Sequence, residues 1–422
     1  MSSVPQLDKL MGRFDNMDDY FKYFTREIGG VDYLDIDEPI GKVFFYHGDF
    51  SHIQGIELLK RTKEFEFECW RPYSKITKVY SKNVGGIIHK IFPQDTKKDI
   101  FGRMTYYSES LERELLTEIN QNNILVTHGY PSFFMTKLWM RIKPINIPII
   151  AIHRGSKLLN FAMDEVSGYK KLIVYLKHRF ELKVLRKYVD YYQDTIQIQI
   201  DYLRKKKINY LYFFPEGIDF EKYQPVEHSN EIRTKLGLPL DKKIILYVGN
   251  FTRTKDIDFL IDVYLELKEI RNDILLACVG GYTYDEFYKK GLDSGALMIE
   301  RLPQEKLLEY HQISNVYVLP TRNYAVKNFA GIGSAVIQSL ACGVPVISDN
   351  LMHFEGGNTE ISKVGMLLEN KEKLISNINY ILDNPRSFSE CRDYARKYYD
   401  ADICINKSIY YYNLLFKKYY GI

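Results

Sequence analysis

The chain has 422 residues, of which 45% are hydrophobic and 27% are charged, and its formal net charge is +4. This length is too great for one compact core, so we expect two or three domains of roughly 100–200 residues. The mild charge and the lack of any helix-turn-helix, zinc-knuckle or RNP-type pattern exclude nucleic acid as the expected partner.

The cysteines and the hydropathy pattern predict a cytoplasmic protein. The five cysteines are widely spaced without a Cys-x-x-Cys pair, and Cys278 and Cys342 lie inside apolar runs, as reduced core cysteines do. A polar stretch follows Met1, where a signal peptide would carry a charged head and an apolar segment. No apolar run approaches the ~20 residues that span a bilayer.

The first half of the chain predicts a parallel sheet. Residues 1–40 are polar and acidic and predict an extension outside the core. From Lys42 on, apolar runs alternate with amphipathic stretches, which is typical of strands joined by right-handed crossover helices, apart from an irregular stretch around Gly85-Gly86. A charged helix is predicted over 165–190. The expected strands are Val43–Tyr46, Phe65–Cys69, Ile124–Val126, Ile149–Ile152 and Tyr210–Phe214, and the expected helices are Ile53–Thr62, Ser108–Asn120 and Phe133–Met140.

The second half repeats this alternation after a turn at Pro215-Glu216-Gly217. Asp256 is expected to cap the second helix of this half at its N-terminus. The expected strands are Lys243–Val248, Ile274–Val279, Val316–Leu319 and Val344–Ser348, and the expected helices are Ile257–Ile270, Glu305–Ile313 and Ala335–Ala341.

The fold class is therefore α/β, with two Rossmann-like domains facing each other across a cleft. We expect the extension over 1–40, a first domain over 41–215 and a second over 216–395. A C-terminal helix around 396–420 is expected to pack back on the first domain.

Three histidines lie where ligands bind in such sheets, just beyond the carboxyl ends of strands. His47, His128 and His153 each follow a predicted strand of the first domain. The alternative is that each caps a strand or bonds the backbone. A zinc site built from all three lacks a clustered carboxylate or cysteine, so we expect no metal.

Two glycine-containing loops of the second domain are suited to phosphate. The first runs from Gly249 and Asn250 through Arg253 to Lys255, just before a helix N-terminus, where amides and the helix dipole favour an anion. The second, Gly331-Ile332-Gly333-Ser334, also leads into a helix, and its glycines allow close approach of the backbone to a ligand. Each loop alone is weak evidence, because turns between strands and helices require glycine anyway.

The segment Lys243–Ser348 resembles the donor domain of retaining glycosyltransferases of family 4, which have the GT-B fold. Lys255 matches the diphosphate-binding lysine of that family, whereas Asn250 stands where the family has arginine. The family's second signature has two glutamates separated by seven residues, followed by Ala-Cys-Gly-x-Pro-Val. This chain reads Ala330 and Gln338 at the glutamate positions and then Ala341-Cys342-Gly343-Val344-Pro345-Val346.

The resemblance extends more loosely over residues 42–415. Phe214–Asp219 is similar to the interdomain turn of the family, Leu302–Pro320 to the segment that holds the nucleobase, and Ile150–His153 to the strand that ends in the acceptor-side histidine. Ala330 cannot bond a sugar hydroxyl, while Gln338 can still bond the ribose without charge. Arg253 is a candidate to replace the missing cation, and the amides of residues 331–334 are candidates to hold the sugar.

The resemblance implies retaining, metal-independent transfer of a hexose from a UDP- or GDP-sugar to an acceptor hydroxyl, with no other cofactor. Lys255 would stabilise the leaving diphosphate, His153 would contact the sugar or the acceptor, and His47 and Gly55 would line the cleft. Because both glutamates are replaced, an inactive subunit that binds a partner glycosyltransferase is the alternative. An epimerase or phosphorylase would require an acidic cluster or a pyridoxal-type lysine, which the sequence does not suggest.

The predicted helix over 165–190 suggests a surface role. Between Lys170 and Asp190 there are seven basic and two acidic residues, and apolar residues recur every four positions. Such a helix can dock on an anionic membrane at the cytoplasmic leaflet. The alternative is a solvated face on a helix that packs against the core. The apolar positions are Leu172, Leu176, Phe180, Val184 and Tyr188.

Overall fold

The structure is a computed structural model that divides into two compact units. The first contains the described residues up to Gly217 and those from Cys404 on, and the second contains Ile218–Ile403. The predicted extension 1–40 and the predicted helix Ile53–Thr62 lie outside the described residues, apart from their last positions. The described residues are 39–46, 62–73, 76–84, 86–98, 104–128, 133–152, 167–212, 217–227, 229–281, 285–321 and 333–421.

The first unit contains an eight-stranded sheet in the order β10-β9-β8-β7-β1-β2-β4-β3, in which only the β3–β4 pair is antiparallel. A separate antiparallel pair is formed by β5 (Asp95–Lys98) and β6 (Met104–Tyr107). The strands of the large sheet are β1 (Gly41–Tyr46), β2 (Phe65–Tyr73), β3 (Tyr80–Val84), β4 (Ile87–Pro93), β7 (Asn123–His128), β8 (Ile149–Ile152), β9 (Tyr191–Asp194) and β10 (Tyr210–Tyr212).

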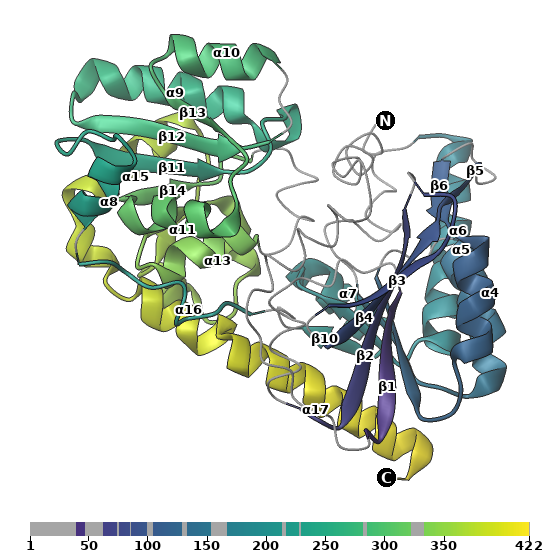
Figure 1. The fold of residues 1–422 in the computed structure, drawn as a ribbon. Coiled ribbons are helices and arrows are strands. Elements are labelled where there is room, and N and C mark those ends of the chain that lie inside the picture. The colour runs from purple at the N-terminus through teal and green to yellow at the C-terminus, as the bar shows by residue number, and fades with distance from the viewer. Residues whose placement is uncertain are drawn as a thin grey trace. The chain divides into compact units, whose positions relative to one another are not determined.

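Helices cover both faces of this sheet, so the unit has three layers (Figure 1). Successive residues of β1 point to opposite faces of the sheet. Phe44 and Tyr46 join the core under the helices of one face, whereas Val43 and Phe45 join the core under α17 (Ala401–Tyr420) on the other face. From Ile405 on, α17 contributes buried residues to this second core. The helices are α4 (Glu109–Glu118), α5 (Phe133–Ile142), α6 (Tyr169–Tyr188) and α7 (Gln197–Lys205) on one face and α17 (Ala401–Tyr420) on the other.

Two predictions for this unit were wrong. The stretch around Gly85-Gly86 is not irregular, because it joins β3 to β4 in an antiparallel hairpin. The sequence prediction also missed β9 and α7, which follow the charged helix. The residues of β9, Tyr191–Asp194, alternate too little to show a strand period, yet three of the four are buried between β8 and β10.

The predicted apolar stripe of the charged helix is not one face. Leu172, Leu176 and Phe180 are exposed, Val184 is buried and Tyr188 is half-buried. A step of four residues overshoots one helical turn of 3.6 residues by about 40°, so a stripe at this spacing winds from one side of the helix to the other. None of the helices that the structure describes combines the length and apolarity that crossing a bilayer requires.

The second unit contains a parallel six-stranded sheet in the order β13-β12-β11-β14-β15-β16. The central strands β11, β12, β14 and β15 consist mainly of buried apolar residues, which suit a sheet covered on both faces. The predicted strand Val344–Ser348 is shorter than expected, because only Val346 and Ile347 pair with both neighbours. The strands are β11 (Lys243–Val248), β12 (Ile274–Gly280), β13 (Leu297–Glu300), β14 (Val316–Val318), β15 (Val346–Ile347) and β16 (Gly365–Met366).

Figure 1 shows α9 and α10 on one face of this sheet and α11 and α13 on the other. The prediction that the side chain of Asp256 caps α9 is wrong. Asp256 occupies the N-cap position, but its φ of 51° is left-handed and its side chain makes no capping hydrogen bond. The main helices are α8 (Ser229–Lys235), α9 (Ile257–Ile270), α10 (Asp285–Asp293), α11 (Gln304–Ile313), α13 (Ser334–Ala341), α14 (Asn358–Ile361), α15 (Lys371–Asp383) and α16 (Cys391–Tyr399).

Candidate nucleotide-sugar site

The strand order of the second unit places side by side the two strands that precede the predicted phosphate loops. The chain proceeds from β11 outward through β12 and β13, and then returns to the other side of β11 with β14. Ligands bind at the carboxyl ends of the two strands that flank such a switch point. The loop that begins at Gly249 follows β11, and the chain that leads to Gly333 follows β14, which pairs with β11 through Leu246 and Tyr317.

Two glycines are required where the first loop leaves β11, because a Cβ at either position would be too close to neighbouring atoms. A Cβ on Gly280, the last residue of β12, would lie 1.7 Å from the carbonyl oxygen of Gly249. A Cβ on Gly249 would lie 2.8 Å from the hydroxyl oxygen of Tyr247. That hydroxyl donates a hydrogen bond of 2.8 Å to the carbonyl oxygen of Asn250. The loop therefore packs tightly on the ends of two strands.

Lys255 ends the short 3-10 turn η3 (Arg253–Lys255), just before α9. Its side chain is half-buried, and burial lowers the pKa of its ammonium group. Among the described residues, no carboxylate forms an ion pair with it. A cation that is partly desolvated and lacks a counter-charge is suited to an anionic ligand.

Arg253 and Asn250 lie in the same loop but differ from Lys255. The guanidinium of Arg253 is mostly exposed and forms an ion pair of 3.0 Å with Glu286 of α10. Asn250 is half-buried, and its carbonyl oxygen also accepts a hydrogen bond from the amide of Thr252 at 3.0 Å. The donor-binding roles of both residues stay predictions.

The second loop ends at the N-terminus of α13. Gly333 occupies the N-cap position with extended backbone and offers no capping side chain, and Ser334 at the first helical position is exposed. The first amides of an uncapped helix lack intrahelical partners and can bind an anion. Gly331 and Ile332 lie outside the described residues.

Gln338, at the position of the family's second glutamate, is buried on α13 at 5% exposure. Its side-chain amide donates a hydrogen bond of 3.1 Å to the hydroxyl of Tyr223, which in turn donates one of 2.9 Å to Gln304. The amide group therefore already has a protein partner, and its ribose contact stays a prediction. Leu302, in the segment expected to hold the base, is half-buried just after β13.

The sequence reasoning missed Thr321, which lies just beyond β14. This residue is 1% exposed, and its hydroxyl has no hydrogen-bond partner in the described structure. Buried hydroxyls normally have partners, so this one is a candidate to bond a ligand. The signal available in the sequence was a polar residue directly after an apolar strand, the same signal that selected the histidines.

The predicted histidines of the first unit belong to three adjacent strands. β8, β7 and β1 are neighbours in the sheet, and the chain reverses its direction of progress between β1 and β7, so these carboxyl ends also flank a switch point. His128 is the last residue of β7 and pairs with Ile152. His47, Gly55 and His153 lie outside the described residues, as does the side chain of His128.

No group of three or more histidine, cysteine, aspartate or glutamate residues within the described ranges could hold a metal ion. Because two of the three candidate histidines are outside those ranges, the expectation of a metal-free protein stays a prediction.

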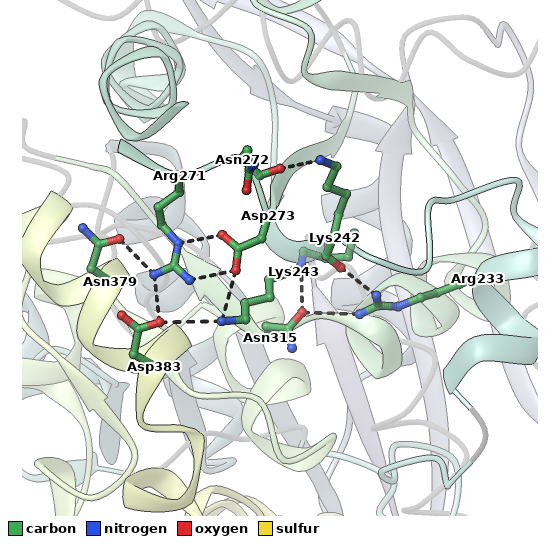
Figure 2. Close-up of polar contacts among 10 residues, drawn as sticks. Arg233, Lys242, Lys243, Arg271, Asn272, Asp273, Asn315, Asn379 and Asp383 are labelled. Carbon is green, nitrogen blue, oxygen red and sulfur yellow. Dashed lines mark hydrogen bonds and ion pairs between the residues drawn. The ribbon is translucent and has the colours of Figure 1, made fainter. Parts of the chain in front are cut away.

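The amino edge of the second sheet, where its strands begin, is also polar, but its groups bond one another, as Figure 2 shows. Arg271 donates two hydrogen bonds to Asp273, at 2.8 and 2.9 Å, and pairs with Asp383 at 3.0 Å. Lys243 pairs with Asp273 at 3.2 Å. Arg233 donates to the carbonyl oxygens of Lys242 and Ile313 at 2.7 and 3.0 Å. The contacts of Arg271 join α9 and α15 to the starts of the strands, and because each nitrogen of its guanidinium has a partner, this residue has a structural role.

Comparison with known proteins finds related sequences mainly for the second unit. The family described as "Glycosyl transferases group 1" matches residues 228–398, which cover most of the second unit. A GDP-mannose-dependent alpha-(1-6)-phosphatidylinositol monomannoside mannosyltransferase of Mycolicibacterium smegmatis is 28% identical over 141 residues, which are 32% of this chain and 37% of the relative. A D-inositol 3-phosphate glycosyltransferase of Thermobispora bispora is 26% identical over 144 residues, which are 31% of this chain and 32% of the relative. The chain thus spans between 32% and 37% of the length of these two curated relatives.

Solved structures match over nearly the whole chain. A sucrose-phosphate synthase from Thermosynechococcus elongatus has a TM-score of 0.64 at 18% identity, covering 90% of this chain and all of its own. Anabaena HepE in complex with UDP has a TM-score of 0.63 at 11% identity, covering 87% of this chain and 98% of its own. At these identities the likeness shows the fold. The chain therefore has the GT-B fold of two Rossmann-like domains, and the predicted resemblance of its second half to glycosyltransferases is confirmed over residues 228–398.

Proposed function

We propose that this protein transfers a hexose from a nucleoside-diphosphate sugar, UDP- or GDP-linked, to an acceptor hydroxyl, with retention at the anomeric carbon and without a metal ion. One observation carries the proposal. The ammonium of Lys255 is partly desolvated and has no ion-pair partner in the described structure. Lys255 belongs to the loop after β11, and β11 pairs with β14, the strand that leads to the uncapped start of α13.

The proposed mechanism rests on the charge that develops in the reaction. As the glycosidic bond to the diphosphate breaks, negative charge accumulates on the phosphate oxygens. The ammonium of Lys255 and the first amides of α13 are fixed donors that would stabilise this charge more in the transition state than in the ground state. The same groups would make a divalent cation unnecessary. Retention follows from the resemblance to family 4.

The acceptor side of the proposal rests on the first unit. His153 and His47 would follow β8 and β1 at the switch point of that sheet, and His128 ends the strand between them. We propose that His153 contacts the sugar or the acceptor hydroxyl. The acceptor hydroxyl would belong to a glycan, a lipid, a protein or a small molecule, and we propose a cytoplasmic location for the reaction.

A thermal-shift panel of UDP, GDP and their sugars tests the donor proposal, because a ligand that binds only the native state raises its melting temperature. We expect one base to raise it. In Lys255→Ala we expect the affinity for that nucleotide to fall about 10- to 100-fold, the loss of one charge-assisted contact, and transfer activity to disappear. Lys255→Arg should retain part of the affinity because it keeps the charge.

The matched control is Arg271→Met, which removes a cation from the opposite edge of the same sheet. It should lower the melting temperature without ligand and leave the nucleotide-induced rise unchanged. Equal nucleotide affinity in wild type and Lys255→Ala would overturn the assignment of the phosphate site.

A second candidate function is a non-catalytic GT-B subunit that binds or stabilises an active glycosyltransferase. It is favoured by Gln338, whose amide is buried and bonded to Tyr223 at the position where the family has a ribose-binding glutamate. The replacement of the first glutamate by Ala330 points the same way. Absence of a shift with every nucleotide in the panel would support this second function and exclude the first.

A further inference from the structure

Helix α6 of the first unit has one face that packs against the core and, on the opposite side, an exposed apolar face. The inner face contains His178, Glu181, Leu182 and Leu185, all of which are buried. Their spacing of three and four residues is that of one side of a helix.

The outer face of α6 repeats this spacing on the opposite side of the helix, nearer its start. Tyr169 is 73% exposed, Leu172 59%, Leu176 56% and Phe180 56%, and Ile173 lies between them at 36%. These five residues are defined here as the outer face. Single exposed apolar residues are common on proteins, but five on successive turns of one helix form a patch that indicates an interaction surface.

The exposed charges that α6 itself carries are all positive. α6 contains one acidic residue, Glu181, and this carboxylate is buried and bonded to His178 at 2.9 Å. Exposed basic residues occur along the outward side of the helix. Within the described part of the chain no carboxylate pairs with them. They are Arg179, Lys183 and Lys187.

The basic surface continues onto the end of α7. Arg186 donates hydrogen bonds of 3.2 and 2.7 Å to the carbonyl oxygen of Lys206, so the last turn of α6 lies beside the chain that follows α7. Lys205 and Lys207 are exposed there. Together these residues extend the positive surface beyond one end of the outer face.

We propose that the outer face of α6 docks on an anionic phospholipid surface. Five apolar side chains would enter the boundary between headgroups and acyl chains, and the flanking lysines and arginines would lie at the level of the lipid phosphates. Apolar burial and phosphate attraction act together in helices that lie in the plane of a membrane interface. Because the exposed charges of α6 are all positive, the outer face suits negatively charged lipid better than a second copy of this chain, whose α6 would carry the same charges.

Sedimentation of the full chain with vesicles tests this docking surface. We expect binding to vesicles of phosphatidylcholine with about one third phosphatidylglycerol, and little binding to phosphatidylcholine alone. Salt at about 0.5 M should weaken the binding, because it screens the lysine–phosphate attraction. The triple variant Leu172→Gln, Leu176→Gln, Phe180→Gln should lower the bound fraction at least about tenfold.

A matched control replaces three exposed aliphatic residues of the second unit in one variant, Leu240→Gln, Ile270→Gln and Leu292→Gln. These residues are 54%, 64% and 52% exposed, close to the values on α6, so the control removes similar apolar surface. It should bind anionic vesicles as the wild type does. The variant Lys183→Ser with Lys187→Ser keeps the apolar face and should bind more weakly with a smaller salt dependence.

A fluorescence measurement reports insertion independently. Phe180→Trp adds an exposed indole to the outer face, and its emission should move to shorter wavelength on anionic vesicles only. Failure of the wild type to bind these vesicles, or equal binding by the α6 triple variant, would overturn the proposal. Self-association of the wild type without lipid, abolished in the triple variant, would assign the face to a second copy instead. Nucleotide is absent from these assays, so their outcome is separate from that of the donor proposal.

Discussion

The two edges of the six-stranded sheet in the second unit carry similar polar residues and use them in opposite ways. At the amino edge, the three guanidinium nitrogens of Arg271 contact Asp273, Asn379 and Asp383, which accept its hydrogen bonds or pair with it. At the carboxyl edge, Lys255 has no ion-pair partner among the described residues, and the hydroxyl of Thr321 has no hydrogen-bond partner there either.

The difference separates a stabilising cluster from a candidate binding site. An open hollow of about 720 Å³ lies at the amino edge, lined by residues such as Arg271 and Asp273, but these groups already satisfy one another. At the other edge a ligand would supply the missing partners. Lys255 and Thr321, which lack such partners in the described structure, therefore make the carboxyl edge the candidate binding site, whereas the size of the hollow would favour the amino edge.

The largest effect is expected from filling the close contact at the carboxyl edge. In Gly280→Ala the new methyl group would collide with the backbone of Gly249 at 1.7 Å, and backbone cannot move aside as a flexible side chain can. We expect a loss of at least about 3 kcal/mol in the free energy of unfolding, measured by denaturant titration. Gly357→Ala is the matched control: its φ is −90° and nothing lies within 4 Å of the added Cβ, so its stability should be unchanged.

Removing the central cation of the amino edge should cost less. Arg271→Met deletes the charged hydrogen bonds to Asp273 and should lower the free energy of unfolding by about 2 kcal/mol, measured by denaturant titration. Nucleotide affinity, measured by calorimetry, should not change. A large loss of affinity in this variant would mean that the two edges are coupled, and would contradict the assignment of separate roles to them.

The amino edge should also give stability a specific pH dependence. Hydrogen bonds from Arg271, together with Lys243, hold the pKa of Asp273 well below its usual range. A carboxylate whose folded-state pKa is lowered stabilises the fold above its unfolded pKa near 3.9, and this contribution is lost as the pH falls toward the folded value.

Asp273→Asn should therefore flatten the fall in melting temperature below about pH 4 relative to wild type. Asp241→Asn, which removes a carboxylate that is 77% exposed and 3.8 Å from Lys242, is the control and should follow the wild-type curve. Identical curves for Asp273→Asn and wild type would contradict the assignment.

The smallest effect is expected for Arg253→Ala. Its ion pair with Glu286 is exposed on both sides, so the free energy of unfolding should change by no more than about 0.5 kcal/mol. Calorimetry should show a smaller loss of nucleotide affinity than in Lys255→Ala. A loss as large as that of Lys255→Ala would instead show that Arg253 leaves Glu286 to bind the diphosphate.

Much of the fold could be predicted from the sequence, because strands buried on both faces are continuous apolar runs. Lys243–Val248 and Ile257–Ile270 were predicted with their observed bounds. Local pattern failed where tertiary contacts decided the structure. The short strand β9 is recognisable only between its neighbours, and Asp256 adopts a left-handed backbone because the 3-10 turn precedes it.

The candidate site divides in the same way. Glycine-punctuated loops after strands and one lysine at a helix start are visible in the residue order, so the sequence by itself determined the phosphate loops and the glycosyltransferase resemblance. Only the tertiary structure decided that β11 and β14 are neighbours, that Gly280 admits the carbonyl of Gly249, that Arg253 pairs with Glu286 and that Gln338 bonds Tyr223. The physical reason is that hydrogen-bond partners and steric contacts join residues far apart in the chain, and no local pattern specifies them.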